Sequence, residues 1–162
     1  MSDHDIELFI KDFLKEIRED NAASFSGAGF SASAGYVNWR ELIRPIAQEL
    51  RLNVDKESDL VAVAQYYCNE NSGNRHRLNQ AIIDQLSVVT TPTKNHNILA
   101  RLPISTYWTT NYDQLIESAL KEAGKIADVK HTTEQLATTK PRRDAIVYKM
   151  HGDMEHPYDA VL

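Results

Sequence analysis

A chain of 162 residues, 42% of them hydrophobic and 25% charged, is typical of one globular domain with a real core. The net charge of −5 argues against a nucleic-acid or acidic-membrane surface, and no apolar run approaches the roughly 20 residues that span a bilayer. The acidic N-terminal segment lacks the pattern of a signal peptide and Cys68 stands alone, so we predict a cytoplasmic protein without an internal disulfide.

The first part of the chain predicts a helix, a short strand and a glycine-rich turn. Apolar residues recur at three- and four-residue spacing from Asp5 to Glu19, as in an amphipathic helix. Residues 22–25 then predict a strand that runs into Gly27-Ala28-Gly29. Glycines directly after a strand let a ligand approach the backbone, and the N–H groups of a following helix start offer an anion site. Taken alone, this turn fits a nucleotide pyrophosphate and a purely structural role equally well.

A long helical excursion follows the turn. Asn38 is a candidate N-cap for a helix that Pro45 is expected to bend or break, and Ser58 is a candidate cap for the next helix. A later helical pattern is stopped by Pro103. Residues 40–101 are therefore predicted to be mostly helical, as an insertion or a small helical layer beside a sheet.

The last part of the chain alternates strands and helices. Further strands are predicted at residues 104–109, 126–129 and 145–150. A helix is predicted from Asn111 to Ala123, closed by Gly124, and a shorter one at residues 133–137. Because strands alternate with helices, the predicted fold class is α/β, with a mostly parallel, Rossmann-like sheet.

Three predicted strands each run into a polar turn that could carry chemistry. These turns are Gly27-Ala28-Gly29, Thr110-Asn111-Tyr112-Asp113 and His151-Gly152-Asp153. Ligands of open parallel sheets bind outside the carboxyl ends of the strands, so the three turns are predicted to meet in one pocket. Each also has a structural interpretation. Asn111 could cap a helix, Asp113 could favour its dipole, and His151 could be an ordinary turn residue.

Three motifs, in the same order along the chain, resemble those of sirtuins. GAGFSASAGYVNWR is similar to the pattern GAG-x-S-x-x-x-G-I-P-D-F-R, TTNYD resembles T-Q-N-I-D, and KMHGD carries the His-Gly pair. The first motif matches at Gly27, Ala28, Gly29, Ser31, Gly35 and Arg40. Longer blocks such as NHNILARLPISTYWTTNYDQLIE resemble the N-terminal part of the Thoeris antiphage effectors, which join a sirtuin-like domain that degrades NAD+ to a C-terminal sensor domain.

This resemblance implies a site and a reaction. NAD+ is expected as the substrate, hydrolysed at the nicotinamide–ribose bond to nicotinamide and ADP-ribose. Asn111 is expected to orient water and ribose, and His151 to act as a base near neutral pH. The pyrophosphate is assigned to Gly27, Ala28, Gly29 and Ser31. Arg40 and Asp113 are expected to help order the loop beside the nicotinamide.

The resemblance also implies a domain organisation and partners. Residues 1–162 would be the N-terminal portion of a sirtuin-like NAD-binding domain, truncated before the rest of the cleft and before the sensor domain. The complete effector is expected to be a homo-oligomer that responds to a cyclic ADP-ribose-type signal through the sensor domain.

Two alternatives to an NAD+ hydrolase stay open. Deacetylating sirtuins carry paired zinc cysteines, and Cys68 alone cannot form such a module, so no zinc or other metal is expected. An NAD-dependent protein deacylase is nevertheless one alternative. A non-catalytic nucleotide-binding or assembly module, or an inactive fragment, is the other.

Overall fold

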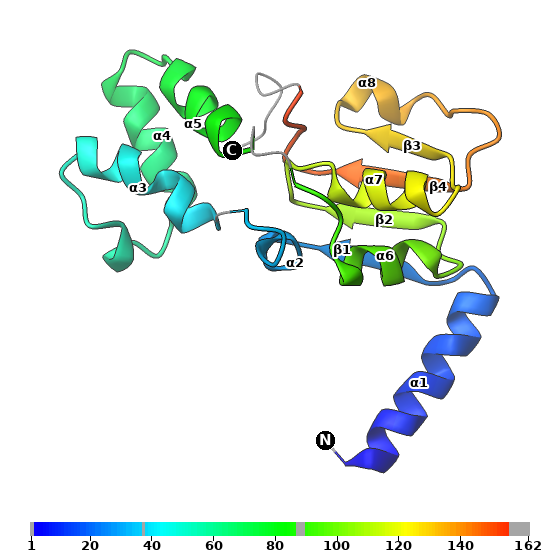
Figure 1. Cartoon of the computed structure of the whole chain (residues 1–162). Helices are drawn as coiled ribbons and strands as arrows, with labels where there is room; N and C mark the ends of the chain where they lie inside the picture. Colours follow the sequence, from blue (N-terminus) through cyan, green and yellow to red (C-terminus); the bar gives the residue numbers. More distant parts are fainter. Residues whose placement is uncertain (1, 37, 87–89, 156–162) are drawn as a thin grey trace.

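A computed structural model describes residues 2–36, 38–86 and 90–155, and its centre is a sheet of four parallel strands (Figure 1). The strand order is β1 (Ala23–Ser26), β2 (Thr106–Thr109), β4 (Ala145–Lys149) and β3 (Ala127–Lys130). Ser26 pairs with Thr109, which pairs with Lys149, so these strands end level with one another. The predicted α/β class with a parallel, Rossmann-like sheet is confirmed.

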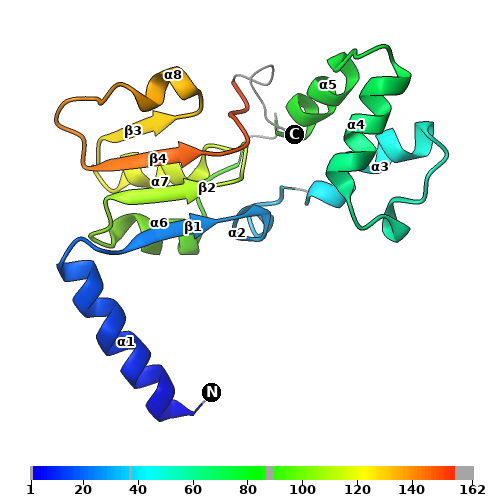
Figure 2. The same cartoon turned by 180° about the vertical axis from the view of Figure 1, so that it is seen from behind.

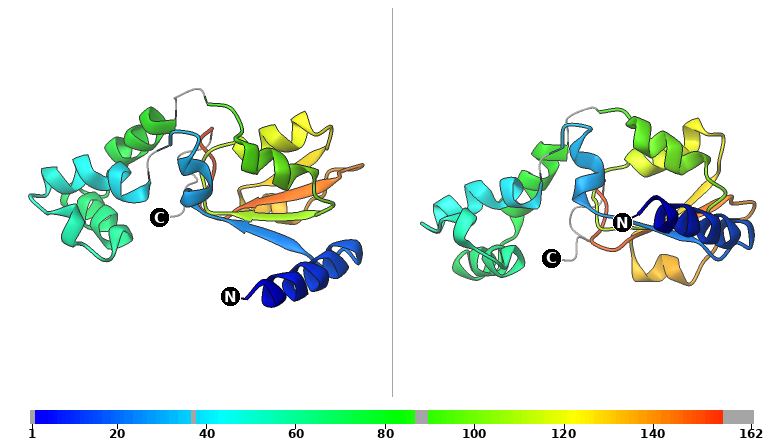
Figure 3. Two further views of the ribbon diagram at one scale, coloured as in Figure 1. Left: turned by 60° about the horizontal axis from the view of Figure 1, so that its bottom comes forward. Right: turned by 90° about the horizontal axis from the view of Figure 1, so that it is seen from below.

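Helices cover one face of the sheet. α6 (Lys94–Arg101) and α7 (Leu115–Glu122) pack against each other over this face (Figure 3). Tyr107 and Val147 point from the strands into the resulting core and are completely buried. On the opposite face, the short α8 (Thr133–Leu136) packs beside β3, while Phe25 and Trp108 are 69% and 37% exposed. The two faces of the sheet therefore differ sharply in how well they are covered.

A helical lobe lies beyond the carboxyl ends of the strands (Figures 1 and 2). It consists of α3 (Trp39–Glu49), the 3₁₀ turn η1 (Val54–Lys56), α4 (Leu60–Glu70) and α5 (His76–Leu86). The lobe has its own core, in which Ile43, Ala47 and Leu78 are completely buried. α6 falls within the helical stretch 40–101 as well, but it packs on the sheet and not in this lobe.

Caps and buried faces decide where the lobe's helices begin. Asn38 caps α3 as predicted, because its side chain accepts the N–H of Glu41 at 3.0 Å. The helix then runs through Pro45 without a break, so that part of the prediction is wrong, whereas a bend at Pro45 stays a prediction. Proline removes one intrahelical hydrogen bond, whereas the buried apolar face of α3 stays intact. α4 is capped by Asp59, so the prediction that Ser58 is the cap is wrong.

The N-terminal helix α1 (Asp3–Arg18) forms close to the predicted bounds and protrudes from the sheet (Figure 1). Its residue Ile17 packs into the core between the sheet and helices α6 and α7. The rest of its apolar stripe is exposed, at Ile6, Phe9, Ile10, Phe13 and Leu14. Neither α1 nor any other helix within the described residues is long and apolar enough to cross a membrane.

Candidate functional site

The glycine-rich turn is the start of a short helix, α2 (Ala28–Ala32), with Gly27 at its N-cap. Neither Gly27 nor Gly29 has a positive φ, so the backbone conformation itself does not require glycine here. A Cβ added to Gly29 would meet no atom within 4 Å, and one added to Gly27 would lie 3.5 Å from Thr110 Oγ1. Space is therefore open beside the first turn of α2, where the N–H of Phe30 donates to the carbonyl of Gly27 but those of Ala28 and Gly29 have no intrahelical acceptor.

Asn111 joins this turn to the loop after β2. Its side-chain Nδ2 donates to the carbonyl of Gly27 at 3.1 Å and to Ser31 Oγ at 2.9 Å. Its backbone N–H donates to Thr109 Oγ1 at 3.0 Å, and the residue is only 7% exposed. Both amide protons of the side chain are thus used in the bridge. Its Oδ1 is left to accept from a ligand, since no donor to it is found in the described part of the chain.

The helix after this loop begins later than predicted. α7 starts at Leu115, so Asn111 is a loop residue and does not cap a helix. Asp113 is buried, and its Oδ1 accepts the N–H of Leu115 at 3.0 Å. The loop departs from the helical pattern because its polar groups bond to neighbouring turns and to the start of α7. Asp113 therefore holds the loop against α7, which agrees with the structural interpretation of this residue.

His151 follows β4 on the third turn and is exposed. Gly152 has a φ of 107°, a conformation that favours glycine and lets the chain reverse directly after the histidine. The backbone N–H of Met150 donates to Thr109 and that of Met154 to Tyr112, at 2.9 and 3.0 Å. These bonds hold the turn beside the Asn111 loop. The His151 ring itself lies near the ring of Tyr112, at a centroid distance of 6.5 Å.

The three turns therefore lie together at the carboxyl edge, but Arg40 lies elsewhere. Arg40 stands in the first turn of α3, and its Nη1 donates to the carbonyls of Val54 and of Glu57, the latter at 3.0 Å. These contacts tie η1 to α3 inside the helical lobe. A contribution of Arg40 to the loop beside the nicotinamide stays a prediction.

Tyr112 is a buried residue that the sequence analysis did not single out. Its ring stacks on Trp39 at a centroid distance of 6.3 Å, which makes Trp39 part of the packing between the lobe and the sheet edge. Burial raises the pKa of Tyr112 to about 12. Its hydroxyl has no hydrogen-bond partner among the described residues. The only sequence signal was its position between Asn111 and Asp113.

His96 on α6 is the second buried polar residue that was missed. It is 1% exposed, and its ring packs against Phe30 of α2 at a centroid distance of 4.4 Å. Its Nδ1 accepts the N–H of Thr93 at 3.3 Å, and its Nε2 has no partner among the described residues. Burial lowers the pKa of His96, although the charge of Asp113 acts in the opposite direction. Only the tertiary fold brings this histidine next to the glycine-rich turn.

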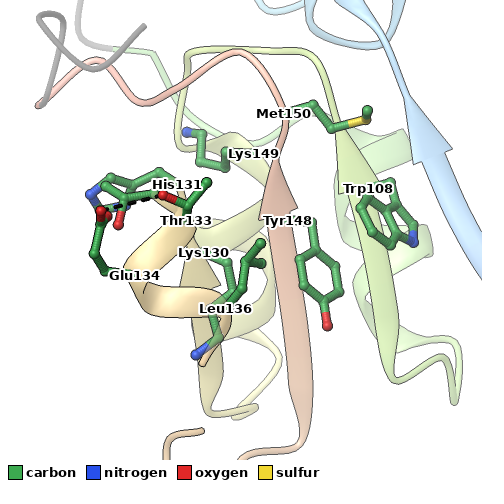
Figure 4. A pocket seen from close by; sticks show the side chains of 10 residues that line it. Trp108, Lys130, His131, Thr133, Glu134, Leu136, Tyr148, Lys149 and Met150 are labelled. Atoms are coloured by element: carbon green, nitrogen blue, oxygen red, sulfur yellow. Dashed lines mark hydrogen bonds between the residues drawn. The ribbon is translucent and has the colours of Figure 1, made fainter. Parts of the chain in front are cut away.

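A hollow of about 430 Å³ opens between β4 and α8, on the less covered face of the sheet (Figure 4). Trp108 and Tyr148 line it, with their rings stacked at a centroid distance of 4.2 Å. Lys149 and Met150 also line it, but none of the residues predicted for the site does. The hollow borders the turn of His151 without containing the predicted chemistry.

The described residues contain one buried cysteine thiol and no group of side chains arranged to bind a metal ion. Cys68 is buried on α4 in the core of the helical lobe. In residues 2–36, 38–86 and 90–155, no three His, Cys, Asp or Glu side chains are arranged to hold a metal ion.

Comparison with known proteins gives one family and several close relatives. Residues 105–162 match the family described as SIR2-like domain. The chain is 68% identical, over 97% of its length, to the NAD(+) hydrolase ThsA of Bacillus cereus (strain MSX-D12). It is 57% identical to the NAD(+) hydrolase ThsA of Acinetobacter baumannii (strain 532279) over 100% of its length, and 54% to that of Cytobacillus dafuensis over 98%. It covers 33%, 33% and 32% of these three relatives, and so spans about a third of their length. The sirtuin-like resemblance indicated by the three motifs is confirmed.

Proposed function

We propose that this chain, which is sirtuin-like and similar along nearly its whole length to the Thoeris effector ThsA, forms part of an NAD+ hydrolase of antiphage defence. The observation that carries the proposal is the bridge from Asn111 to Gly27 and Ser31. It fastens a buried amide to a dinucleotide-type turn at the carboxyl edge of a parallel sheet, where such sheets bind their ligands. The relatives bear the name NAD(+) hydrolase, which supports the same reaction.

The proposal gives the glycine-rich turn the task of holding the pyrophosphate of NAD+. The first turn of α2 presents backbone N–H groups and the positive end of the helix dipole. The open space beside Gly29 lets phosphate oxygens approach that backbone. Ser31 is buried and accepts from Asn111, so its contribution is to fix the turn and the amide relative to each other.

The chemistry is assigned to the other two turns. Nicotinamide leaves the ribose as a neutral molecule, so the reaction does not need the general acid of ordinary glycosidases. Water adds to the ribose carbon as the carbon–nitrogen bond breaks, and the proton of that water passes to His151. Asn111 Oδ1 accepts a hydrogen bond from the water or from a ribose hydroxyl and so orients it. Because His151 is exposed, it can return the proton to solvent.

Two further features of the proposal come from the likeness to the Thoeris effector. We propose that the complete protein works in the cytoplasm as a homo-oligomer. We also propose that a cyclic ADP-ribose-type signal controls it.

The experiment is to incubate the complete protein with NAD+ and to follow the release of nicotinamide and ADP-ribose, with and without an acylated peptide. We expect release that does not depend on the peptide. Strict dependence on the peptide would instead identify a deacylase, and calorimetric binding of NAD+ without turnover would identify a non-catalytic module. Activity that survives both Asn111→Ala and His151→Ala would contradict the assignment of these residues.

A further inference from the structure

Lys149 is a completely buried cation at the end of β4, and it contacts two of the three turns at once. Its Nζ donates to the carbonyl of Tyr112 at 3.0 Å and to that of Asp113 at 2.6 Å, directly after Asn111. The same Nζ lies 2.6 Å from Asp153 Oδ2, on the turn that carries His151. An ammonium has three protons to donate, and these three oxygens can use all of them.

The charges around Lys149 are arranged to keep this ammonium in place. Burial alone would raise the pKa of Asp153, but the charge of Lys149 and hydrogen bonds from Lys149, Glu155 and Gln114 hold it below the ordinary value. Burial raises the pKa of Glu117, whose Oε1 lies 3.3 Å from Lys149 Nζ without hydrogen-bond geometry. Asp153 is therefore the carboxylate that balances the buried charge. Breaking such a pair leaves an uncompensated charge in the interior.

We propose that Lys149 is a positioning residue that sets the placement of Asn111 relative to His151. This inference rests on the proposed function, because it assumes that these two side chains act on one substrate. Asn111 directly precedes the first carbonyl that Lys149 holds, and His151 lies between Lys149 and Asp153 in the chain. β4 is paired on both sides, so the lysine extends from a fixed strand. The ammonium is thus a common anchor for two loops that are also joined by the backbone hydrogen bond from Met154 to Tyr112, the side-chain hydrogen bond from Gln114 to Asp153 and the ring contact of His151 with Tyr112.

A second buried lysine provides a matched control. Lys130, at the end of the neighbouring strand β3, is 5% exposed. Its Nζ pairs with Asp128 Oδ2 at 2.8 Å and donates to the carbonyl of Thr138 at 2.6 Å. Lys130 lies on the α8 side of the sheet, and Figure 4 shows the two lysine side chains extending in different directions. Replacing Lys130 therefore removes a comparable buried cation without touching either turn.

The test compares Lys149→Met with Lys130→Met in the complete protein. For Lys149→Met we expect the kcat of nicotinamide release to fall about 10- to 100-fold, because small displacements of reacting groups are costly. We expect KM to change less than about threefold, since the pyrophosphate turn keeps its own contacts. For Lys130→Met both constants should stay within about threefold of wild type. Hydrogen exchange should become faster at residues 110–114 and 151–155 in Lys149→Met only.

A second variant keeps the test decisive where Lys149→Met fails to fold. Asp153→Asn preserves the contacts from Lys149 to the two carbonyls but removes the ionic tie to the turn of His151, so a smaller loss of kcat in the same direction is expected. Equal kcat values for the two lysine variants, or unchanged exchange at both loops, would overturn the inference. A wild-type protein that releases no nicotinamide would refute the proposed function instead, and the exchange measurement would then decide the role of Lys149 by itself.

Discussion

The Asn111 loop and the His151 turn leave the same edge of the sheet but are built in opposite ways. Asn111 is buried, and its side chain donates to two groups of the glycine-rich turn. His151 is exposed, and its ring lies 6.5 Å from the ring of Tyr112, measured between centroids. The Asn111 side chain is therefore part of the hydrogen-bonded framework that holds the turns together, whereas the His151 side chain lies outside this framework.

The difference separates two demands that a hydrolytic site makes. A group that orients water or ribose must keep a fixed geometry, which buried hydrogen bonds provide. A base must exchange protons with solvent between turnovers, which exposure allows. In this chain the framework residue, Asn111, is tied to folding, whereas the proposed base, His151, is not. Substitutions should therefore affect stability and activity together at one turn and activity alone at the other.

The largest expected effect is at these two residues. Asn111→Ala should lower kcat/KM by about 10³-fold or more and the free energy of unfolding by about 1–3 kcal/mol, because the carbonyl of Gly27 and the hydroxyl of Ser31 lose a buried partner. His151→Ala should lower kcat by about 10²- to 10⁴-fold, the usual contribution of a general base. Its free energy of unfolding should stay within about 0.5 kcal/mol of wild type, since the side chain is exposed. Nicotinamide release and urea unfolding measure the two quantities.

An aspartate at position 111 sharpens this comparison. Asn111→Asp keeps an acceptor oxygen but cannot donate to the carbonyl of Gly27, so it should lose at least as much stability as Asn111→Ala. If His151→Ala destabilised the protein as much as Asn111→Ala, the contrast between framework and base would be wrong.

Features set by local sequence patterns could be predicted, whereas features set by tertiary contacts could not. Strands, most helices and the three turns follow from local patterns, because apolar spacing and turn residues act over a few positions. A break at Pro45, offered as an alternative to a bend, and a helix start at Asn111 are wrong, because a buried helix face in one case and neighbouring turns in the other override local preference. The contacts of Lys149 depend on residues far apart in the chain, so no local sequence pattern predicts them.

A smaller effect is expected in the glycine-rich turn. Gly29→Ala should raise KM for NAD+ about tenfold, equal to about 1.4 kcal/mol, because the added methyl group occupies the open space through which we propose the pyrophosphate approaches. The free energy of unfolding should not fall, because alanine is the better helix former and Gly29 lies within α2. Initial rates at varied NAD+ and urea unfolding check both parts.

Gly124→Ala is the matched control for this substitution. Gly124 closes α7 with a φ of 77°, so alanine there should cost about 1–2 kcal/mol of stability and leave KM unchanged. An unchanged KM in Gly29→Ala would mean that the space beside α2 does not hold the substrate.

The smallest expected effect concerns His96, the buried histidine beside the glycine-rich turn. Burial lowers the pKa of His96 from 6.5, so the unfolded chain binds a proton at a higher pH than the folded chain does. The stability associated with His96 is therefore fully present above about pH 6.5 and is lost as the pH falls toward its folded pKa, with a slope of at most about 1.4 kcal/mol per pH unit.

His96→Gln keeps an acceptor for the N–H of Thr93, because glutamine is a usual partner at this position of a capping box. Urea unfolding between about pH 8 and about pH 5 should show a weaker loss of stability on acidification in His96→Gln than in wild type. Equal slopes in wild type and His96→Gln would show that the buried imidazole does not couple folding to pH.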